Sequence, residues 1–146
     1  MRRHGSTQRG SVLILVPAGV LVLMILGAIC VDFSIAYLAH RQLQDAASAA
    51  VNDAAGAALD EARLRAGDGA ATLDPELARE VALESLAATL HGPVRLTSPP
   101  VVEVQGTHVT VRLEGDAPYV FSGGIPGAPK RVHVRAVAGG ELVQEP

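Results

Sequence analysis

The sequence predicts an α+β protein, in which one long helix comes first, a second helix follows and an antiparallel β meander ends the chain. Residues 11–31 contain no charged side chain, and residues 32–66 contain no proline and one glycine, so a helical pattern continues through both segments. Farther along, apolar and polar residues alternate in VVEVQ at 101–105 and in HVTVRL at 108–113. Helices and strands that are segregated along the chain are typical of the α+β class.

The first predicted element is a transmembrane helix at residues 11–31, SVLILVPAGVLVLMILGAICV. At 1.5 Å per residue this helix covers about 31 Å, which matches the hydrocarbon thickness of a bilayer. Residues 1–10 carry basic side chains and no acidic one; the basic residues are Arg2, Arg3 and Arg9. By the positive-inside rule we expect residues 1–10 to be a basic cytoplasmic leader, and the chain after Val31 to be extracytoplasmic. The predicted location is the inner (plasma) membrane, crossed once.

Two other interpretations of the apolar segment fit less well. Signal-peptide cores are about 7–15 residues long and end at a small-x-small site, which does not follow here, so we expect a retained anchor. Cys30 is the chain's one cysteine, and Ile29 before it is larger than a lipoprotein acylation site requires. We therefore interpret Cys30 as a small apolar membrane residue. A disulfide within the exported part is excluded.

An alanine-rich extracytoplasmic helix is predicted at residues 32–66. Together with residues 11–31 it is expected to form one helix of about 50 residues, with bends at Pro17 and Gly56. Small residues step by three or four along one face, and the candidate helix-packing or assembly contacts on this face are Ala46, Ala50 and Ala54. Alanine buries little area but lets two backbones approach closely. Two alternatives stay open: this face covers the protein's own sheet, or it packs against neighbouring subunits. Asp32 also has two interpretations, a carboxylate in the headgroup region or an intersubunit contact.

Residues 74–146 are predicted to form a small α+β domain after a loop at 67–73. Asp74 has the position of an N-cap, and Pro75 has the first helical position. We expect this second helix to run to about His91, because glycine and proline follow it directly.

The strands are expected at 101–105, 108–113, 119–121 and 131–138. Gly106-Thr107 between the first two strands is typical of a two-residue hairpin turn. The valines of the hairpin share one face, and Val132, Val134 and Ala136 share one face of the last strand.

Composition argues against several classes of function. Residues 32–146 carry nine Lys and Arg against fifteen Asp and Glu, and the whole chain has two Tyr, two Phe and no Trp, so nucleic acid is not an expected partner. The five histidines include no i, i+4 pair and no Cys/His cluster. His108 and His133 are the pair that could face one another on neighbouring strands. We expect no enzymatic activity, no metal or other cofactor, and no small-molecule substrate.

The segment from Arg9 to about Ala58 resembles the N-terminal region of the TadE/TadG-like family of Flp (tight adherence) pilus assembly proteins. The residues that carry the resemblance are Arg9-Gly10-Ser11-Val12, Val31-Asp32, Tyr37-Leu38-Ala39, Arg41, Leu43-Gln44 and Ala46-Ala47-Ser48-Ala49-Ala50. The resemblance implies a pilin-like layout and partners among other pilus-assembly or pilin-like subunits, contacted through the helix. In pilin-like members a prepilin peptidase cuts after a glycine, so Gly10 and Ser11 are a candidate processing site. Leu15 stands where such members have a glutamate.

The resulting hypothesis is a single-pass membrane accessory component of a Flp/Tad-type pilus assembly or secretion apparatus, either minor pilin-like or TadG-like. Because the glutamate is missing, a membrane-retained TadG-like protein fits better than a true minor pilin. The alternative is a membrane-tethered extracytoplasmic binding module unrelated to pili. A tethered enzyme is disfavoured, since no catalytic constellation is found.

Overall fold

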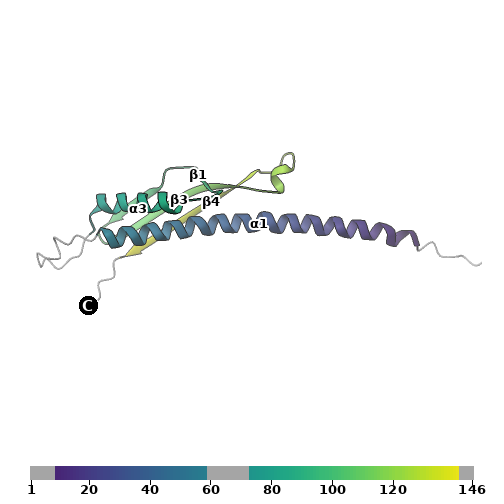
Figure 1. Ribbon diagram of the computed structural model, residues 1–146, viewed down its shortest axis with the longest axis horizontal. Coiled ribbons are helices and arrows are strands. Elements are labelled where there is room, and N and C mark those ends of the chain that lie inside the picture. Colours follow the sequence, from purple (N-terminus) through teal and green to yellow (C-terminus); the bar gives the residue numbers. More distant parts are fainter. Residues whose placement is uncertain (1–8, 59–72, 142–146) are drawn as a thin grey trace, which may run out of the picture.

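The computed structural model describes residues 9–58 and 73–141, and they form an α+β fold built on one long helix. Helix α1, Arg9–Ala57, extends along the whole length of the molecule, and helix α3, Pro75–Thr89, lies beside its C-terminal part. A four-stranded antiparallel sheet packs on this same C-terminal part (Figure 1). The predicted α+β class, with a long first helix, a second helix and an antiparallel sheet, is therefore confirmed.

Helix α1 is continuous for 49 residues and includes Pro17. It ends at Ala57, directly after Gly56, where a bend was expected. The part of the predicted helix at residues 59–66 and most of the loop at 67–73 lie outside the described residues, as do residues 1–8 of the leader and residues 142–146. Within the described chain, α1 is the one helix that is long and apolar enough to cross a membrane by length and composition.

Strand β3, His108–Pro118, is the centre of the sheet. One of its edges pairs along its full length with β4, Arg131–Glu141, and the other pairs first with β2, Val101–Gln105, and then with β1, Arg95–Leu96. The expected meander is confirmed, but β3 is five residues longer than predicted. Strand β1 was not predicted, because two residues are too few to show a periodicity.

The predicted hairpin between β2 and β3 is present. Val102 lies opposite Val111 and Val104 lies opposite Val109, so these valines share a face as expected. Gly106 has a φ of 62°, which a residue with a Cβ rarely adopts, and Thr107 has no positive φ. Positive φ at the first linking residue alone fits a type II′ turn.

The strand expected at 119–121 is wrong. Residues 119–121 lie in the connection between β3 and β4, outside any strand. The N–H groups of Val120 and Phe121 donate to a side chain of α1 and not to a neighbouring strand. A local strand-like pattern was overridden by a contact that is remote in the sequence.

Helix α3 begins as predicted. The Asp74 carboxylate accepts hydrogen bonds from the N–H groups of Glu76 at 3.0 Å and Leu77 at 3.3 Å, and Pro75 is the first helical residue. The helix ends at Thr89, two residues before the expected His91.

Both helices cover the same face of the sheet, since side chains alternate between buried and exposed along β3. The buried apolar side of α1 consists mostly of alanine, together with Leu43 and Val51; the alanines are Ala39, Ala46, Ala47, Ala50 and Ala54. Close approach is visible at Gly140, where a Cβ would lie 2.5 Å from Val51 Cγ1. Small residues on α1 and β4 therefore allow the helix to lie directly against the sheet.

Polar side chains of α1 also reach across to the rest of the domain. Gln44 Nε2 donates to the Val137 carbonyl at 3.1 Å, and Asp53 Oδ2 accepts the Ser85 hydroxyl at 2.6 Å. These hydrogen bonds attach α1 to β4 and to α3 at two different heights.

Candidate functional site

The most constrained polar group among the described residues is the carboxylate of Asp32, the first residue after the apolar run. Its Oδ1 accepts the N–H groups of Val120 and Phe121, both at 3.0 Å, and its Oδ2 accepts the N–H of Ser122 at 2.7 Å. Asp32 is 8% exposed and is the one buried charged residue in the described part of the chain. We call this arrangement the Asp32 clamp, because it holds the loop between β3 and β4 onto α1.

Hydrogen bonding keeps the clamp in its charged form. Burial raises the pKa of the Asp32 carboxyl, but the backbone hydrogen bonds from Phe121, Ser122 and Val120 outweigh it and lower the pKa to about 2. The Ser122 hydroxyl is buried beside this carboxylate and also contributes to lowering its pKa. Asp32 therefore acts through its negative charge and its two acceptor oxygens.

The clamped segment is the β3–β4 loop, residues 119–130. The Tyr119 N–H donates to the Lys130 carbonyl at 3.1 Å where the two strands separate. A short 3-10 turn, η1, Ser122–Gly124, follows, and its N-terminal cap is Phe121. The loop projects from the end of the sheet over the middle of α1 (Figure 1).

Three open, mostly apolar hollows flank the clamp on α1. Ile29, Phe33 and Tyr119 line the first hollow, beside Asp32. The others lie closer to the N-terminus of α1 and are lined by Phe121 together with Ile25 and Ala28. Asp32 and Ser122 also line two of the hollows, and most of the remaining lining is apolar.

This geometry adds a third interpretation of Asp32, that of an intrachain hydrogen-bond acceptor for the β3–β4 loop. Its carboxylate accepts hydrogen bonds from backbone N–H groups of its own chain, in the β3–β4 loop. The candidate contacts Ala46, Ala50 and Ala54 are 0% exposed and lie in the core formed with the protein's own sheet and α3. Of the two alternatives for the alanine face, the fold favours the first over this stretch. Gly10 and Ser11 lie in the first turn of α1.

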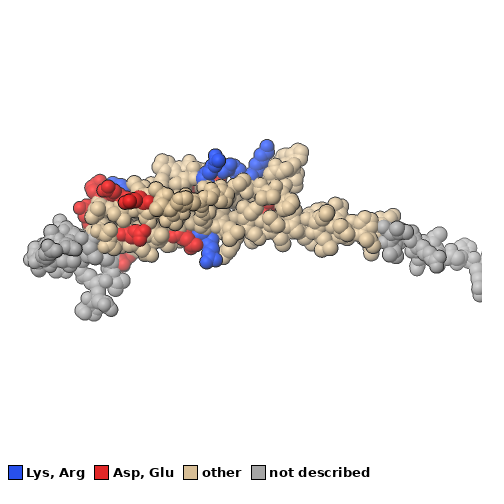
Figure 2. All heavy atoms as spheres, viewed as in Figure 1, with Lys and Arg blue, Asp and Glu red and all other residues tan. Residues whose placement is uncertain are grey.

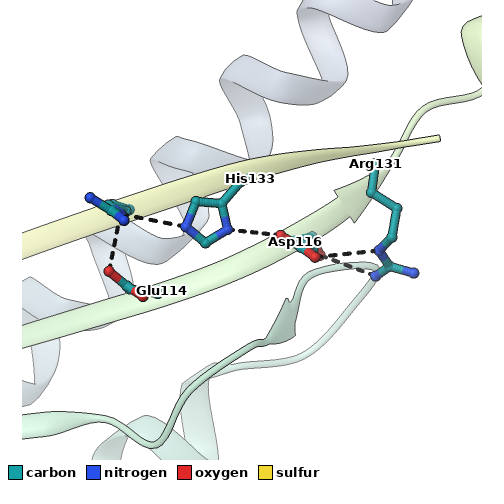
Figure 3. Close-up of polar contacts among 5 residues, drawn as sticks. Glu114, Asp116, Arg131 and His133 are labelled. Atoms are coloured by element: carbon teal, nitrogen blue, oxygen red, sulfur yellow. Dashed lines mark hydrogen bonds and ion pairs between the residues drawn. The ribbon is translucent and has the colours of Figure 1, made fainter. Parts of the chain in front are cut away.

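A second polar cluster lies on the exposed face of the sheet (Figure 3). His133 Nδ1 is 2.9 Å from Asp116 Oδ1, Arg131 Nε is 3.8 Å from Asp116 Oδ2, and Arg135 Nε is 3.0 Å from Glu114 Oε1. These residues alternate on neighbouring strands, which is the geometry of cross-strand charge pairs. No group of metal-ligating residues is found in the described ranges.

His108 and His133 do not face one another. The register of β3 and β4 places His108 opposite Glu141 and His133 opposite Asp116. The two histidines therefore lie near opposite ends of the pair of strands, because the antiparallel register begins with Pro118 opposite Arg131.

Comparisons with protein-family models, with curated proteins and with solved structures gave no match. The resemblance to TadE/TadG-like proteins therefore depends on the residues quoted above.

Sequence reasoning selected Asp32 but missed its partners. Residues 120–122 carry no side chain that marks them, because they contribute backbone N–H groups. The available signal was the glycine- and proline-rich stretch after Phe121, SGGIPGAPK, which indicates a loop but does not identify the group that its backbone binds.

Proposed function

We propose that this chain is a single-pass membrane accessory component of a Flp/Tad-type pilus assembly or secretion apparatus, minor pilin-like or TadG-like. The observation that carries the proposal is that one continuous helix has two parts in different surroundings. Residues 14–31 of α1 are apolar and almost wholly exposed, whereas the half that follows packs into a folded domain. The residues quoted for the family resemblance occupy the same helix.

The exposed half of α1 supports a bilayer as its surroundings. Its side chains are large and aliphatic, and burying such surface is favourable by about 25 cal/mol per Å². A helix satisfies its own backbone hydrogen bonds, so it can enter hydrocarbon without a partner. The arginines before the span favour a cytoplasmic N-terminus and an extracytoplasmic domain.

The surface proposed for partner subunits is the outward side of α1 just after the span. Phe33, Tyr37 and Leu38 are exposed there, with Phe33 exposed by 75%. The alanine face is used by the chain's own sheet, so the outward side is what α1 offers to other pilus-assembly or pilin-like subunits. We propose that the chain works through such contacts and catalyses no reaction.

Site-specific photo-crosslinking in the cells that make the protein tests this proposal. We expect p-benzoylphenylalanine in place of Phe33 or Tyr37 to cross-link to membrane subunits of the pilus machinery, identified by mass spectrometry. The control is the same probe in place of Arg112, an exposed residue on the outer face of the sheet. Cross-links from both helix positions to an extracytoplasmic protein unconnected with pili would instead support the tethered binding module.

Mass spectrometry of the N-terminus separates the two forms of the proposal. A chain purified from membranes that begins at Ser11 has been cut after Gly10 and is minor pilin-like. A chain that retains residues 1–10 is TadG-like, which is the expected result because Leu15 replaces the glutamate.

A further inference from the structure

We propose that the β3–β4 loop is a second membrane contact, which seats Val120, Phe121 and Ile125 in the outer boundary of the bilayer that α1 crosses. The inference rests on the proposed span at residues 11–31 and adds a lipid-binding element to the domain outside it. The occupant of this surface is lipid.

The position of the loop along α1 sets its depth. Phe121 and Ile125 line hollows together with Ile25 and Ala28, which belong to the last two turns of the span. Ile25 lies six residues before Val31, or about 9 Å along the helix axis. Interfacial anchors bury their apolar faces about 5–10 Å into the headgroup and acyl boundary. The loop therefore lies at the level of that boundary when residues 11–31 span the bilayer.

The loop presents apolar surface that the domain does not cover. Val120 is 61% exposed, Phe121 is 49% exposed and Ile125 is 58% exposed. The side chains of α1 beside them, Ile25 and Ile29, are also exposed. The two surfaces are continuous, so the lipid that covers this side of the span also covers the loop.

The backbone of the loop suits an apolar environment. An unsatisfied N–H group in hydrocarbon costs several kcal/mol, so pairing most of the donors of a loop lowers the cost of bringing it to this depth. The Asp32 clamp pairs three consecutive N–H groups. Four more loop residues donate to carbonyls of the loop itself, namely Tyr119, Gly124, Ile125 and Ala128. Pro126 and Pro129 have no N–H to satisfy.

The charges of the domain are arranged to match. On the face shown in Figure 2, acidic side chains gather at the end of the domain farthest from the apolar half of α1, and basic side chains extend toward the loop. Lys130 and Arg131 are exposed where the loop returns to β4. Basic residues at this level interact favourably with anionic headgroups, and the acidic end is held away from the membrane surface.

Depth-dependent fluorescence quenching tests the inference on the full chain in lipid nanodiscs. In a Cys30→Ala background, single cysteines replace Ile125, Met24 or Val137, and each is labelled with the environment-sensitive dye NBD. Met24 reports on the span. Val137 is the matched control, because it is 56% exposed, close to the 58% of Ile125, but lies on β4 away from the loop. Phosphatidylcholine brominated on its acyl chains is the quencher.

We expect the probe at position 125 to be blue-shifted and to lose intensity in brominated lipid, as the probe at 24 does, while the probe at 137 does neither. If the probe at position 125 behaves like the probe at position 137 while the probe at position 24 is quenched, the loop does not enter the bilayer. The inference is then wrong, whereas the proposed membrane span is supported. If the probe at position 24 is not quenched, the proposed membrane span is wrong, and the inference that depends on it is wrong as well. The probe at position 125 could also be blue-shifted without being quenched, and lose this shift when the protein is diluted in lipid. That result would show that a second copy of the chain covers the loop, and would overturn the inference.

Discussion

The Asp32 carboxylate accepts the Ser122 N–H at 2.7 Å across 90 residues of sequence. This hydrogen bond joins the first residue after the apolar run to the turn between the two longest strands. Together with the hydrogen bonds to Val120 and Phe121, it fixes the height on α1 at which the sheet begins.

Removing the clamp should release the β3–β4 loop. In Asp32→Ala the N–H groups of residues 120–122 lose their acceptor, and the loop should be cleaved faster than in the wild type. Limited proteolysis of the full chain in nanodiscs, followed by mass spectrometry of the fragments, measures this rate. The comparison variant is Ser122→Ala, which keeps all three backbone N–H donors and removes only the hydroxyl beside the carboxylate. Equal cleavage of wild type and Asp32→Ala would mean that the clamp does not hold the loop.

Enlarging a side chain on the alanine face should destabilise the domain. Ala50 is 0% exposed against the sheet, and overpacking a site of this kind typically costs about 1–3 kcal/mol. Thermal unfolding of the detergent-solubilised full chain should therefore show a lower midpoint for Ala50→Leu. Asn52→Leu, on the exposed side of the same helix, should leave the midpoint unchanged. A wild-type midpoint for Ala50→Leu combined with failed assembly would instead point to packing on another subunit.

The close contact between α1 and β4 gives a matched pair of glycine substitutions. A Cβ at Gly140 would lie 2.5 Å from Val51 Cγ1 in the core, whereas a Cβ at Gly139 would lie 3.2 Å from the exposed ring of His108. Gly140→Ala should lower stability by about 1–3 kcal/mol in denaturant unfolding, because helix and strand must separate. Gly139→Ala should have little effect, since the His108 ring can rotate away. Equal effects of the two substitutions would contradict the packing described.

Membrane orientation follows from the arginines of residues 1–10. Alkaline phosphatase, which is active only outside the cytoplasm, should be active when fused after Pro146. β-Galactosidase, which is active only inside it, should be inactive at the same site. The opposite pattern would reverse the topology.

Histidine chemistry should be dispensable. Replacement of His91, His108 and His133 by alanine should leave a pilus phenotype and the protein level unchanged, because none of the three lies in a group of metal-ligating residues within the described chain. The phenotype is measured by pilus counts in electron micrographs, and immunoblotting gives the protein level. Lost function at a normal protein level would revive a site that includes His133 and Asp116.

Much of the fold is encoded in local patterns and was predicted from them. Helix α1, the Asp74 cap and the Gly106 turn each depend on residues within a few positions of one another. The valine faces of β2 and β3 followed from simple alternation, and the structure confirms them.

The remaining features depend on contacts between distant residues. Tyr119-Val120-Phe121 has a strand-like composition, and only the carboxylate of Asp32, 88 residues before Val120, explains why its backbone turns away. Likewise, the small side chains on α1 predict close packing, but they do not specify whether the protein's own sheet or another subunit packs against them. The register that separates His108 from His133 depended on the length of β3, which extends beyond its alternating valines to Pro118.

The continuity of α1 has a mechanical consequence. No coil or turn interrupts the helix between residues 9 and 57. Hydrogen bonds accepted by Asp32 and Asp53 and donated by Gln44 attach it to the loop, to α3 and to β4. The domain is therefore joined to the apolar half of α1 by a continuous helix and not by a flexible linker. A pull on the sheet becomes tension along the helix axis, and a twist of the helix about its axis turns the whole domain by the same angle.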